Sequence, residues 1–430
     1  MKTCLLPITL VMVALGAAQS PTEEVVPLVW SHVVASEALD TATDIALDAA
    51  GNVVVVGVTR GDVAGVHRGG DDMVVVKLTA AGEEVWRRQF GGRGDDEATA
   101  VAVDAAGDIW VVGATRDEAT EARTRNLPER DLTLHRLAAD GTLLWQRRYT
   151  DDGDERVVDL SFGDGALYMV GTQTHGDVAR GLVMAVDAVE GDTEGEMLWQ
   201  QLVGEVGSET YAVAVLGGEV VVGGSSPRSI TLPQPNDGRV ERDVTDVLRL
   251  TFAPDGTQRT TQIATLPVTP MPSYLPFRVV DIVLSDERLY ALAGRSAGND
   301  FGSGGYYLHL FDLGEENFGT GLSATESGRL PNDRLWTVFV SAGQEELAVA
   351  ENGRVYAGGP FVTSYLAGED DTPFIDLRPL GWHASALVYD DGVYDDGALY
   401  AAGFNQFGET SGVTPGDSSD MVVFKLAVGR

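Results

Sequence analysis

Cysteine is nearly absent from this chain of 430 residues, which contains only Cys4. Cys4 lies within an amino-terminal apolar segment that we expect to be removed, so the rest of the chain has no thiols for a disulfide framework. The six histidines show no pairing at the spacing of metal ligands on a helix or in a short loop. The sequence therefore predicts neither disulfide bonds nor a histidine-based metal site.

Long apolar runs are absent after the first residues. Lys2 is followed by an apolar run from Leu5 to Leu15 and by small residues ending at Ala18, which is typical of a secretory signal peptide. We expect residues 1–18 to be this signal and residues 19–430 to form one domain. No other apolar run approaches the length of about 20 residues that a membrane helix needs, so membrane insertion is not expected. The predicted location is outside the cytoplasm: periplasmic, cell-surface or extracellular.

Lysine is scarce, and acidic residues are in large excess. Lysine occurs only at Lys2, Lys77 and Lys425, and the formal net charge is −35. Such a surface repels nucleic acids and anionic membranes, so neither is an expected partner. Three explanations of the acidic excess stay open: solubility, adaptation to high salt, and binding of divalent cations.

What the chain does contain is a repeat, most regular from Asp71 to Arg116. Four short apolar runs, each of strand length, are separated there by Gly- or Asp-rich turns. We predict strands over Met73–Leu78, Glu84–Phe90, Ala98–Val103 and Ile109–Gly113. Gly82 and Gly107 lie in the turns, where a residue that tolerates positive φ is needed.

Other copies of the unit follow at similar intervals. Ala46–Gly57 matches Ala102–Gly113 almost residue for residue, and Leu132–Leu137 resembles Met73–Leu78. The glycine near the end of one strand recurs in seven copies, at Gly57, Gly113, Gly171, Gly223, Gly294, Gly358 and Gly403. A four-stranded β unit of this length is typical of a propeller blade. We therefore predict an all-β, seven-bladed β-propeller with four-stranded antiparallel blades.

Tryptophan marks the outer strand of several blades. It follows a glycine by four residues in Gly82–Trp86, Gly141–Trp145 and Gly195–Trp199, and Trp336 has the same place in a later copy. We expect each ring to pack between neighbouring blades, where burial of so large a side chain stabilises the fold by roughly 3–5 kcal/mol.

The two ends of the chain predict how the ring closes. Val26–Val34 has the pattern of an outer strand with no earlier strands, and Met421–Leu426 has the pattern of a third strand. We expect the amino-terminal strand to complete the carboxy-terminal blade, which leaves no open sheet edge at the junction.

The later blades are less regular. Blade four carries an insert, Pro227–Asp243, between its second and third strands, and blade five has longer loops over Gly298–Gly305 and Glu315–Pro331. Blade six is irregular, and Trp382 is the best marker for its fourth strand. Insertions in repeat folds often mark the binding face, so we expect the loops of blades four to six to gather on one side of the ring.

The Asp71–Arg116 stretch resembles the bacterial SBBP-type β-propeller repeat. The residues that carry the resemblance are Asp72, Lys77-Leu78, Trp86, Gly91-Gly92, Asp96 and Ala100–Gly107. The match is specific in blades one and two, recognisable in three and seven, and poor in four to six. The resemblance implies an exported, non-catalytic propeller with no shared catalytic residues.

The glycine–tryptophan turn also resembles, more weakly, the repeats of quinoprotein propellers. These repeats occur in quinone-dependent dehydrogenases and in non-catalytic scaffolds. The chain lacks the adjacent cysteine pair that many such dehydrogenases carry. No cofactor is therefore predicted from this resemblance.

Acidic residues cluster in the turns between blades, and one cluster is a candidate calcium site. Asp151, Asp152, Asp154 and Glu155 surround Gly153. Hard cations such as Ca²⁺ take several oxygen ligands from closely spaced carboxylates and carbonyls. Ordinary turn chemistry, in which Asp side chains bond their own backbone, is the alternative.

The function predicted from the sequence is that of a monomeric binding or scaffold module for a protein or a glycan. The alternative is an extracellular propeller enzyme: a lyase, a glycoside hydrolase or a quinone-dependent dehydrogenase. An enzyme would place carboxylates, histidine or arginine convergently at a pocket. His135 and His309 occupy similar positions in third strands, which indicates packing or exposure within a blade.

Overall fold

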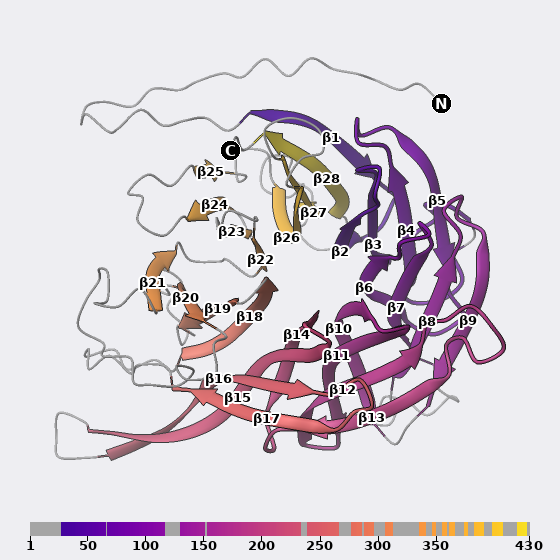
Figure 1. Cartoon of the computed structure of the whole chain (residues 1–430). Helices are drawn as coiled ribbons and strands as arrows, with labels where there is room; N and C mark the ends of the chain where they lie inside the picture. Colours follow the sequence, from indigo (N-terminus) through magenta and orange to yellow (C-terminus); the bar gives the residue numbers. More distant parts are fainter. Residues whose placement is uncertain are drawn as a thin grey trace, which may run out of the picture.

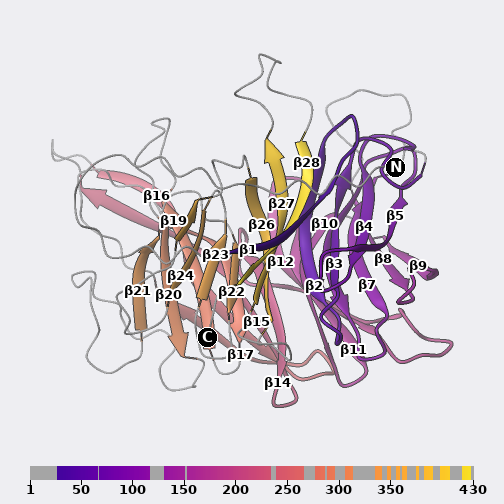
Figure 2. The same ribbon diagram turned by 90° about the horizontal axis from the view of Figure 1, so that it is seen from above.

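The computed structural model describes residues 27–65, 67–116, 130–150, 153–233, 239–265, 277–285, 288–295, 306–312, 335–340, 346–349, 355–358, 361–365, 374–376, 382–390, 398–406 and 419–427. Within these residues, strands β1 to β28 form seven four-stranded sheets. The sheets surround a common axis, and the first strand of each lies toward the centre (Figure 1). Viewed at a right angle to that axis, the strands run from one face of the ring to the other (Figure 2).

Each sheet is one blade, numbered here in chain order. Blades one to three comprise β2 (Asp40–Leu47), β3 (Val53–Thr59), β4 (Asp72–Leu78) and β5 (Glu84–Phe90); β6 (Asp96–Val103), β7 (Ile109–Thr115), β8 (Asp131–Leu137) and β9 (Leu143–Tyr149); and β10 (Asp154–Gly163), β11 (Ala166–His175), β12 (Val178–Asp187) and β13 (Met197–Val203). All seams within these blades are antiparallel.

Blades four to seven follow the same order. They comprise β14 (Glu209–Leu216), β15 (Glu219–Pro233), β16 (Arg239–Phe252) and β17 (Gln258–Ala264); β18 (Phe277–Ser285), β19 (Arg288–Arg295), β20 (Tyr306–Asp312) and β21 (Leu335–Val340); β22 (Glu346–Val349), β23 (Val355–Gly358), β24 (Phe361–Tyr365) and β25 (Phe374–Asp376); and β26 (Trp382–Asp390), β27 (Ala398–Gln406), β28 (Ser419–Ala427) and β1 (Leu28–Val34).

The last blade confirms the predicted closure. β1 pairs antiparallel with β28, with Leu28 opposite Leu426 and Val34 opposite Met421. The amino-terminal strand therefore supplies the outer strand of a blade whose other three strands come from the carboxy-terminal end, and the two lie side by side in Figure 1. The predicted all-β propeller of four-stranded antiparallel blades is the fold of this chain.

The predicted strands of the Asp71–Arg116 unit agree closely with β4 to β7. The Glu84–Phe90 strand has the predicted bounds, and the other three extend by one or two residues. Gly82 and Gly107 adopt φ of 81° and 88°, the left-handed region expected for these turns. Valine-rich strands form because branched side chains fit the half-buried surface between two sheets.

Apolar side chains fill the clefts between neighbouring sheets. One cluster joins blades seven and one, and others join blades one and two, two and three, three and four, and four and five. The core is thus a series of inter-blade layers. No helix among the described residues has the length and hydropathy of a membrane span.

Three of the outer-strand tryptophans, Trp86, Trp145 and Trp199, pack against the next blade, as predicted, and the side chain of Trp336 lies outside the described ones. The indole of Trp86 lies on Gly141 of blade two and donates a hydrogen bond from Nε1 to the carbonyl oxygen of Ala139 at 3.0 Å. Trp199 makes the equivalent bond to Pro254 of blade four at 2.9 Å. The glycine in each turn leaves room for the ring of the preceding blade.

The recurring glycine has a steric cause. Gly57 pairs with Ala42 immediately before the register shifts at a β-bulge in β2. A Cβ atom at Gly57 would lie 2.0 Å from the carbonyl oxygen of Thr41, so glycine is favoured there. The same position is held by Gly113, Gly171 and Gly403 in blades two, three and seven.

In blades four and five the predicted glycine is wrong by one residue. The residue that pairs immediately before the bulge is Gly224 in blade four and Ala293 in blade five. The glycines predicted from the sequence are the neighbouring Gly223 and Gly294. Blade four has two adjacent glycines, and blade five has alanine at this position with glycine next to it, so the residue type alone does not give the register.

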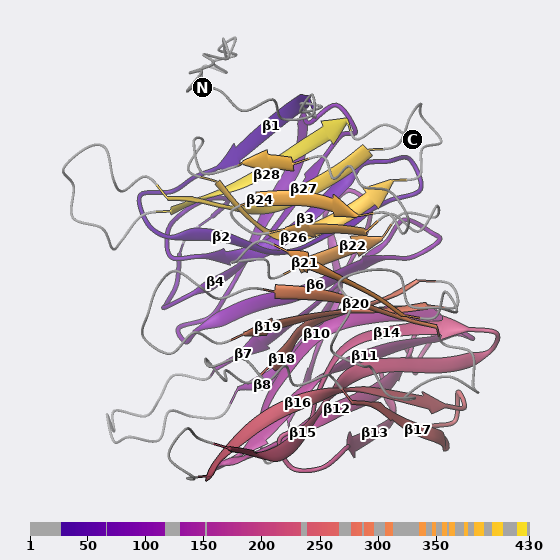
Figure 3. The ribbon, with the colours of Figure 1, turned by 90° about the vertical axis from the view of Figure 1, so that its left-hand side faces the viewer.

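Blade four differs from the prediction of an inserted loop. Most of Pro227–Asp243 continues the pairing of β15 and β16, from Val220 opposite Phe252 to Pro233 opposite Arg239. The hairpin therefore projects past the neighbouring strands (Figures 1 and 3). The Arg228 guanidinium anchors its base through two hydrogen bonds to Asp246, of 2.6 and 2.9 Å.

The assignment of Trp382 to blade six was wrong. Blade six has its four strands before this residue, and Trp382 begins β26, the inner strand of blade seven. The predicted loops Gly298–Gly305 and Glu315–Pro331 of blade five lie outside the described residues.

Candidate functional site: a polar pocket between blades one and two

Two positions in each third strand face the cleft toward the preceding blade. The first of these positions pairs with the second-strand residue that lies opposite the β-bulge. In blade one Val74 pairs with Gly57, and in blade two Thr133 pairs with Gly113. In blades one, three, four and seven both positions are apolar: Val74 and Val76, Leu182 and Met184, Leu248 and Leu250, Val422 and Phe424. In blade five Tyr307 and His309 hold the same register positions, and in blade two they are Thr133 and His135.

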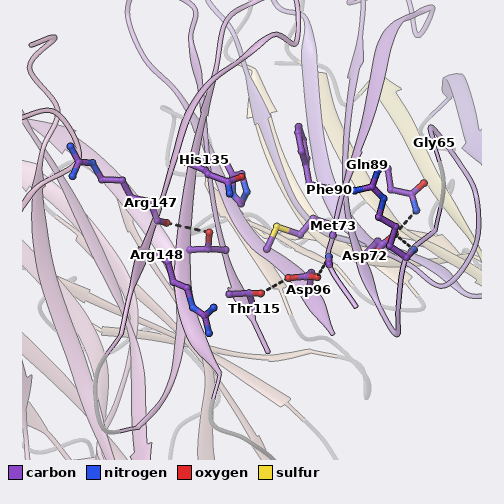
Figure 4. Close-up of a pocket in the computed structure, with 15 residues that line it drawn as sticks. Gly65, Asp72, Met73, Gln89, Phe90, Asp96, Thr115, His135, Arg147 and Arg148 are labelled. Carbon is purple, nitrogen blue, oxygen red and sulfur yellow. Dashed lines mark hydrogen bonds between the residues drawn. The ribbon is translucent and has the colours of Figure 1, made fainter. Parts of the chain in front are cut away.

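This polar pair lines a cavity of about 650 Å³ between blades one and two. Asp72, Phe90 and Gly91 form its wall on the blade-one side, and residues of β6 to β9 form the opposite wall (Figure 4). The volume lies within the range of small-molecule sites, about 300–1,000 Å³. The side chains that would otherwise seal the cleft are replaced by hydrogen-bonding groups.

Asp96 lines the pocket but already has partners for both carboxylate oxygens. Oδ2 accepts a hydrogen bond from the backbone N–H of Gly92 at 2.6 Å, and Oδ1 accepts one from the Thr115 hydroxyl. Blade one has the same contact between Asp40 and Thr59. The repetition indicates that Asp96 ties the start of an inner strand to the end of the second strand.

Asp72 is different, because one of its oxygens is unsatisfied. It is 1% exposed, and its Oδ2 accepts hydrogen bonds from Gln89 Nε2 at 2.7 Å and from the backbone N–H of Arg68 at 3.3 Å. Among the described residues Oδ1 has no hydrogen-bond partner. Oδ1 lies against Gly91, where a Cβ atom would come within 1.9 Å. A buried oxygen without a donor costs free energy that a bound hydroxyl would recover.

His135 supplies a second unsatisfied group. The residue is 5% exposed, its ring lies 5.5 Å from the ring of Phe90, and its Nδ1 has no hydrogen-bond partner in the described part of the chain. Burial lowers the pKa of His135 to about 4, against the opposing effects of Asp96 and Gln146. The imidazole is therefore neutral near pH 7, and with its proton on Nε2 it offers Nδ1 as an acceptor.

Three arginines also border the pocket. Arg148 follows the same face as Thr133, its cross-strand partner, and its Nε donates to Asp131 at 2.6 Å. Arg68 is exposed on the loop that precedes Asp72. Arg147 contributes its backbone, whose carbonyl accepts a hydrogen bond from Thr133, while its side chain points away from the labelled residues in Figure 4.

The structure places only part of the candidate calcium site. Asp151 and Asp152 lie outside the described residues, and Asp154 and Glu155 begin β10. Neighbouring residues in a strand point to opposite faces. Glu155 is 3% exposed and accepts a hydrogen bond from Gln173 at 2.8 Å, the counterpart of the Asp96–Thr115 contact. No group of three His, Cys, Asp or Glu side chains suited to a metal ion occurs within the described residues. Calcium binding stays a prediction.

Buried carboxylates near the axis form a second polar feature. Asp44 in β2 accepts hydrogen bonds from its neighbour Ile45 and from Val101 of blade two, both of 2.7 Å between nitrogen and oxygen. Asp159 bonds Val213 of blade four in the same way, at 2.8 Å. Burial raises the pKa of Asp44 and of Asp159 to about 7. These side chains clamp the inner strands of adjacent blades.

The pocket was not among the sites predicted from the sequence. Asp72 was noted as part of the repeat, and His135 was interpreted as a packing residue. The signal was present: Leu132–Leu137 has Thr133 and His135 where Met73–Leu78 has Val74 and Val76. His309 does share the register of His135, as predicted, since both lie two residues along from the position opposite the bulge. The expected binding loops of blades four to six lie mostly outside the described residues.

Comparison with known proteins supports the fold alone. No family model matches the chain, and no curated protein matches it. The plexin A4 extracellular region is similar with a TM-score of 0.50 at 8% identity, over 91% of this chain and 51% of that chain. The chain thus spans about half the length of that structure.

Two enzymes are among the other similar structures. The GH93 α-L-arabinofuranosidase of Fusarium graminearum has a TM-score of 0.43 at 11% identity, over 75% of this chain and 91% of that chain. A gluconolactonase of Xanthomonas campestris has a TM-score of 0.31 at 16% identity, over 58% and 68%. These neighbours include binding and enzymatic propellers, and the resemblance to the SBBP-type repeat stays a prediction.

Proposed function

We propose that this chain is an exported, non-catalytic binding module whose pocket between blades one and two holds a residue of a glycan. The observation that carries the proposal is the replacement of an apolar pair by Thr133 and His135. Polar groups in an inter-blade cleft cost stability, because they leave Nδ1 of His135 and Oδ1 of Asp72 without donors. Such a cost, at a cleft that encloses a cavity, is typical of a binding site.

A glycan fits the chemistry of the lining. Sugar hydroxyls donate hydrogen bonds to carboxylate oxygens and to a neutral imidazole nitrogen, the two groups left unsatisfied by the protein. Phe90, half-buried on the blade-one wall, offers an apolar surface to the C–H face of a sugar ring. The ligand therefore has hydroxyl donors and an apolar face.

The carboxylates favour binding over hydrolysis. Most glycoside hydrolases pair two carboxyl groups, one as acid and one as base or nucleophile. Asp96 has both oxygens engaged, by Gly92 and Thr115. Asp72 is then the described lining carboxylate whose second oxygen has no partner within the protein. This supports the binding module against the enzymatic alternative.

Calorimetry with a panel of oligosaccharides tests the proposal. The intact protein is expected to bind at least one oligosaccharide, and H135M is expected to weaken that binding at least about ten-fold, because a thioether accepts hydrogen bonds poorly. H32M is the matched control, since His32 lies on the rim and contacts Glu84. Absence of any binding, or equal loss in both variants, would contradict the proposal. Release of new reducing ends would favour the enzyme.

A further inference from the structure

We infer that the glycan residue held in this pocket carries a protonated amine, as an amino sugar does when its nitrogen is not acetylated. This inference rests on the proposed function and names the ligand class of the same site. It follows from the buried carboxylate of Asp72, which forms no ion pair among the described residues.

Asp72 holds a register position at which other blades also carry a charged residue. The position lies two residues before the first cleft-facing residue of the third strand. Its occupants in blades one, two, three, four and seven are Asp72, Asp131, Arg180, Asp246 and Asp420. The repeat therefore places a charged side chain at the same point of each of these blades.

The acidic residues of the other blades are paired or partly solvated. Nε of Arg148 donates a hydrogen bond to Asp131 at 2.6 Å, and Arg228 donates to both oxygens of Asp246, at 2.6 and 2.9 Å. Asp420 is partly exposed, so water can reach it. These contacts matter because a carboxylate removed from water is costly unless a cation and hydrogen bonds compensate it.

Blade one lacks the guanidinium of blade two. The residue in the register of Arg148 is Gln89, because each pairs with the first cleft-facing residue of its own blade. Gln89 donates an uncharged hydrogen bond to Oδ2 of Asp72, and the backbone N–H of Arg68 donates another (Figure 4). Within the described part of the chain, Oδ1 of Asp72 has no partner. The charge of Asp72 is thus left without a counterion there.

The basic residues that line the pocket do not fill this role. Arg148 is paired with Asp131, and the side chain of Arg147 points away from the labelled residues in Figure 4. Arg68 is exposed, where solvent and salt screen its charge. Asp96, the second buried carboxylate of the lining, accepts hydrogen bonds from uncharged donors. A cation at depth would therefore meet two carboxylates in a medium of low dielectric constant.

An ammonium group matches the atoms that the protein leaves unsatisfied. Its three N–H donors suffice for both Oδ1 of Asp72 and Nδ1 of His135. Phe90, which also lines the pocket, is an aromatic surface of the kind that attracts a cation. A hydroxyl supplies one donor and no charge, and acetylation turns the ammonium into a neutral amide. The unacetylated amine is therefore the form that both completes the hydrogen bonds and balances the charge.

Matched oligosaccharides that differ at one ring carbon test this inference. Calorimetry, at a pH below the pKa of the amine, would compare oligomers of glucosamine, glucose and N-acetylglucosamine of equal length and linkage. Oligomers of galactosamine, galactose and N-acetylgalactosamine would form a second set. In at least one set we expect the amine to bind about ten-fold or more tightly than both neutral oligomers.

A single substitution assigns the effect to Asp72. D72N keeps the size of the side chain and one acceptor oxygen but removes the charge, so we expect it to abolish most of the preference for the amine and to change the binding of neutral oligomers much less. D71N is the matched control. It removes the same charge from the neighbouring residue, which pairs with Arg60 at 2.6 Å and does not line the pocket. Thermal melts confirm that both variants are folded.

The outcomes separate the two proposals. Binding of a neutral oligomer as tight as that of its amine, lost in H135M, would overturn the amine and keep the glycan-binding function. A preference for the amine that persists in D72N, or that D71N removes equally, would also overturn it. Equal binding of a short lysine peptide would overturn a sugar as the source of the amine. No binding of any oligomer, together with none in the wider panel, would overturn both proposals.

Discussion

The cleft between blades one and two and the cleft between blades two and three use the same strands in the same register, yet they differ at three levels. At the outer level, Thr133 and His135 border the first cleft, whereas Leu182 and Met184 seal the second. At the axis, Asp44 bridges the first cleft, and its counterpart in the second is Ala100.

The third level lies at the opposite end of the third strands. Lys77 of blade one pairs with Asp48 of its own blade at 2.9 Å and reaches the Ala139 carbonyl of blade two at 3.4 Å. Arg136, its counterpart, forms ion pairs with Asp108 at 2.7 Å and with Glu194 of blade three. The second cleft is thus closed by apolar packing and a cross-blade ion pair, whereas the first combines apolar packing with hydrogen bonds that cross between the blades. A few side chains thus make the cleft between blades two and three a packed interface and leave a polar pocket in the cleft between blades one and two.

Removal of the ion pair should have the largest effect on this contrast. R136M leaves Glu194 and Asp108 without their cation in a buried environment, and we expect the free energy of unfolding to fall by about 3–5 kcal/mol. Chemical denaturation measures the change. R87A, which removes a partly exposed pair with Glu84, should cost no more than about 1 kcal/mol. A loss below 1 kcal/mol in R136M would mean that the seam is held by packing alone.

Transfer of the histidine to the sealed cleft should have an intermediate effect. Met184 is 1% exposed within the core between blades two and three. M184H places an imidazole where nothing has been arranged to accept or donate, so we expect a loss of about 2–4 kcal/mol in the free energy of unfolding. H135M, the reverse change, should raise stability slightly. If both variants lost stability equally, the polar pair would be ordinary core packing.

The smallest effect concerns pH at the axis. Because burial raises the pKa of Asp44 above its unfolded value of 3.8 to about 7, the folded state binds the proton more tightly. Its contribution to stability is therefore greatest in acid and is lost as pH rises through about 7. His135 acts in the opposite sense, but only below its ordinary pKa of 6.5.

Calorimetric melting between pH 6.5 and 8.5 isolates the carboxylate. His135 is present in both proteins, so its titration cancels in the comparison, and the melting temperature should fall by about 1–2 °C more in the parent protein than in D44N. D95N is the control, because Asp95 is a more accessible carboxylate that pairs with Arg116. An unchanged pH dependence in D44N would show that Asp44 stays ionised in the fold.

Most of the fold could be predicted from the sequence, because each regular blade repeats its punctuation. Alternating valines, turn glycines and the outer-strand tryptophans gave the strands of blades one to three and the closing strand. Trp382 misled because a tryptophan there begins an inner strand, at the register position that Asp96 holds in blade two. A residue type identifies a register position only in those blades that keep the residue of the repeat at that position.

The pocket could not be predicted from the same pattern. The sequence shows that Thr133 and His135 interrupt an apolar run, but it does not show which neighbouring blade they face. Asp72 and Phe90, more than 40 positions earlier, face them only because the ring brings the edge of blade one to that cleft. The unsatisfied Oδ1 of Asp72 depends on a contact with Gly91 that no spacing rule predicts.

The pairing of β1 with β28 also determines how the ring responds to force. Leu28 lies opposite Leu426, so the strand ends nearest the two termini leave the sheet at the same edge. A pull on both ends would therefore load the hydrogen bonds one after another, as in a zipper, and not all together in shear. The closing strand is therefore the part of the ring that a pull on the two termini loads first. Opened there, the ring would become a curved row of blades that still bury their cores against one another.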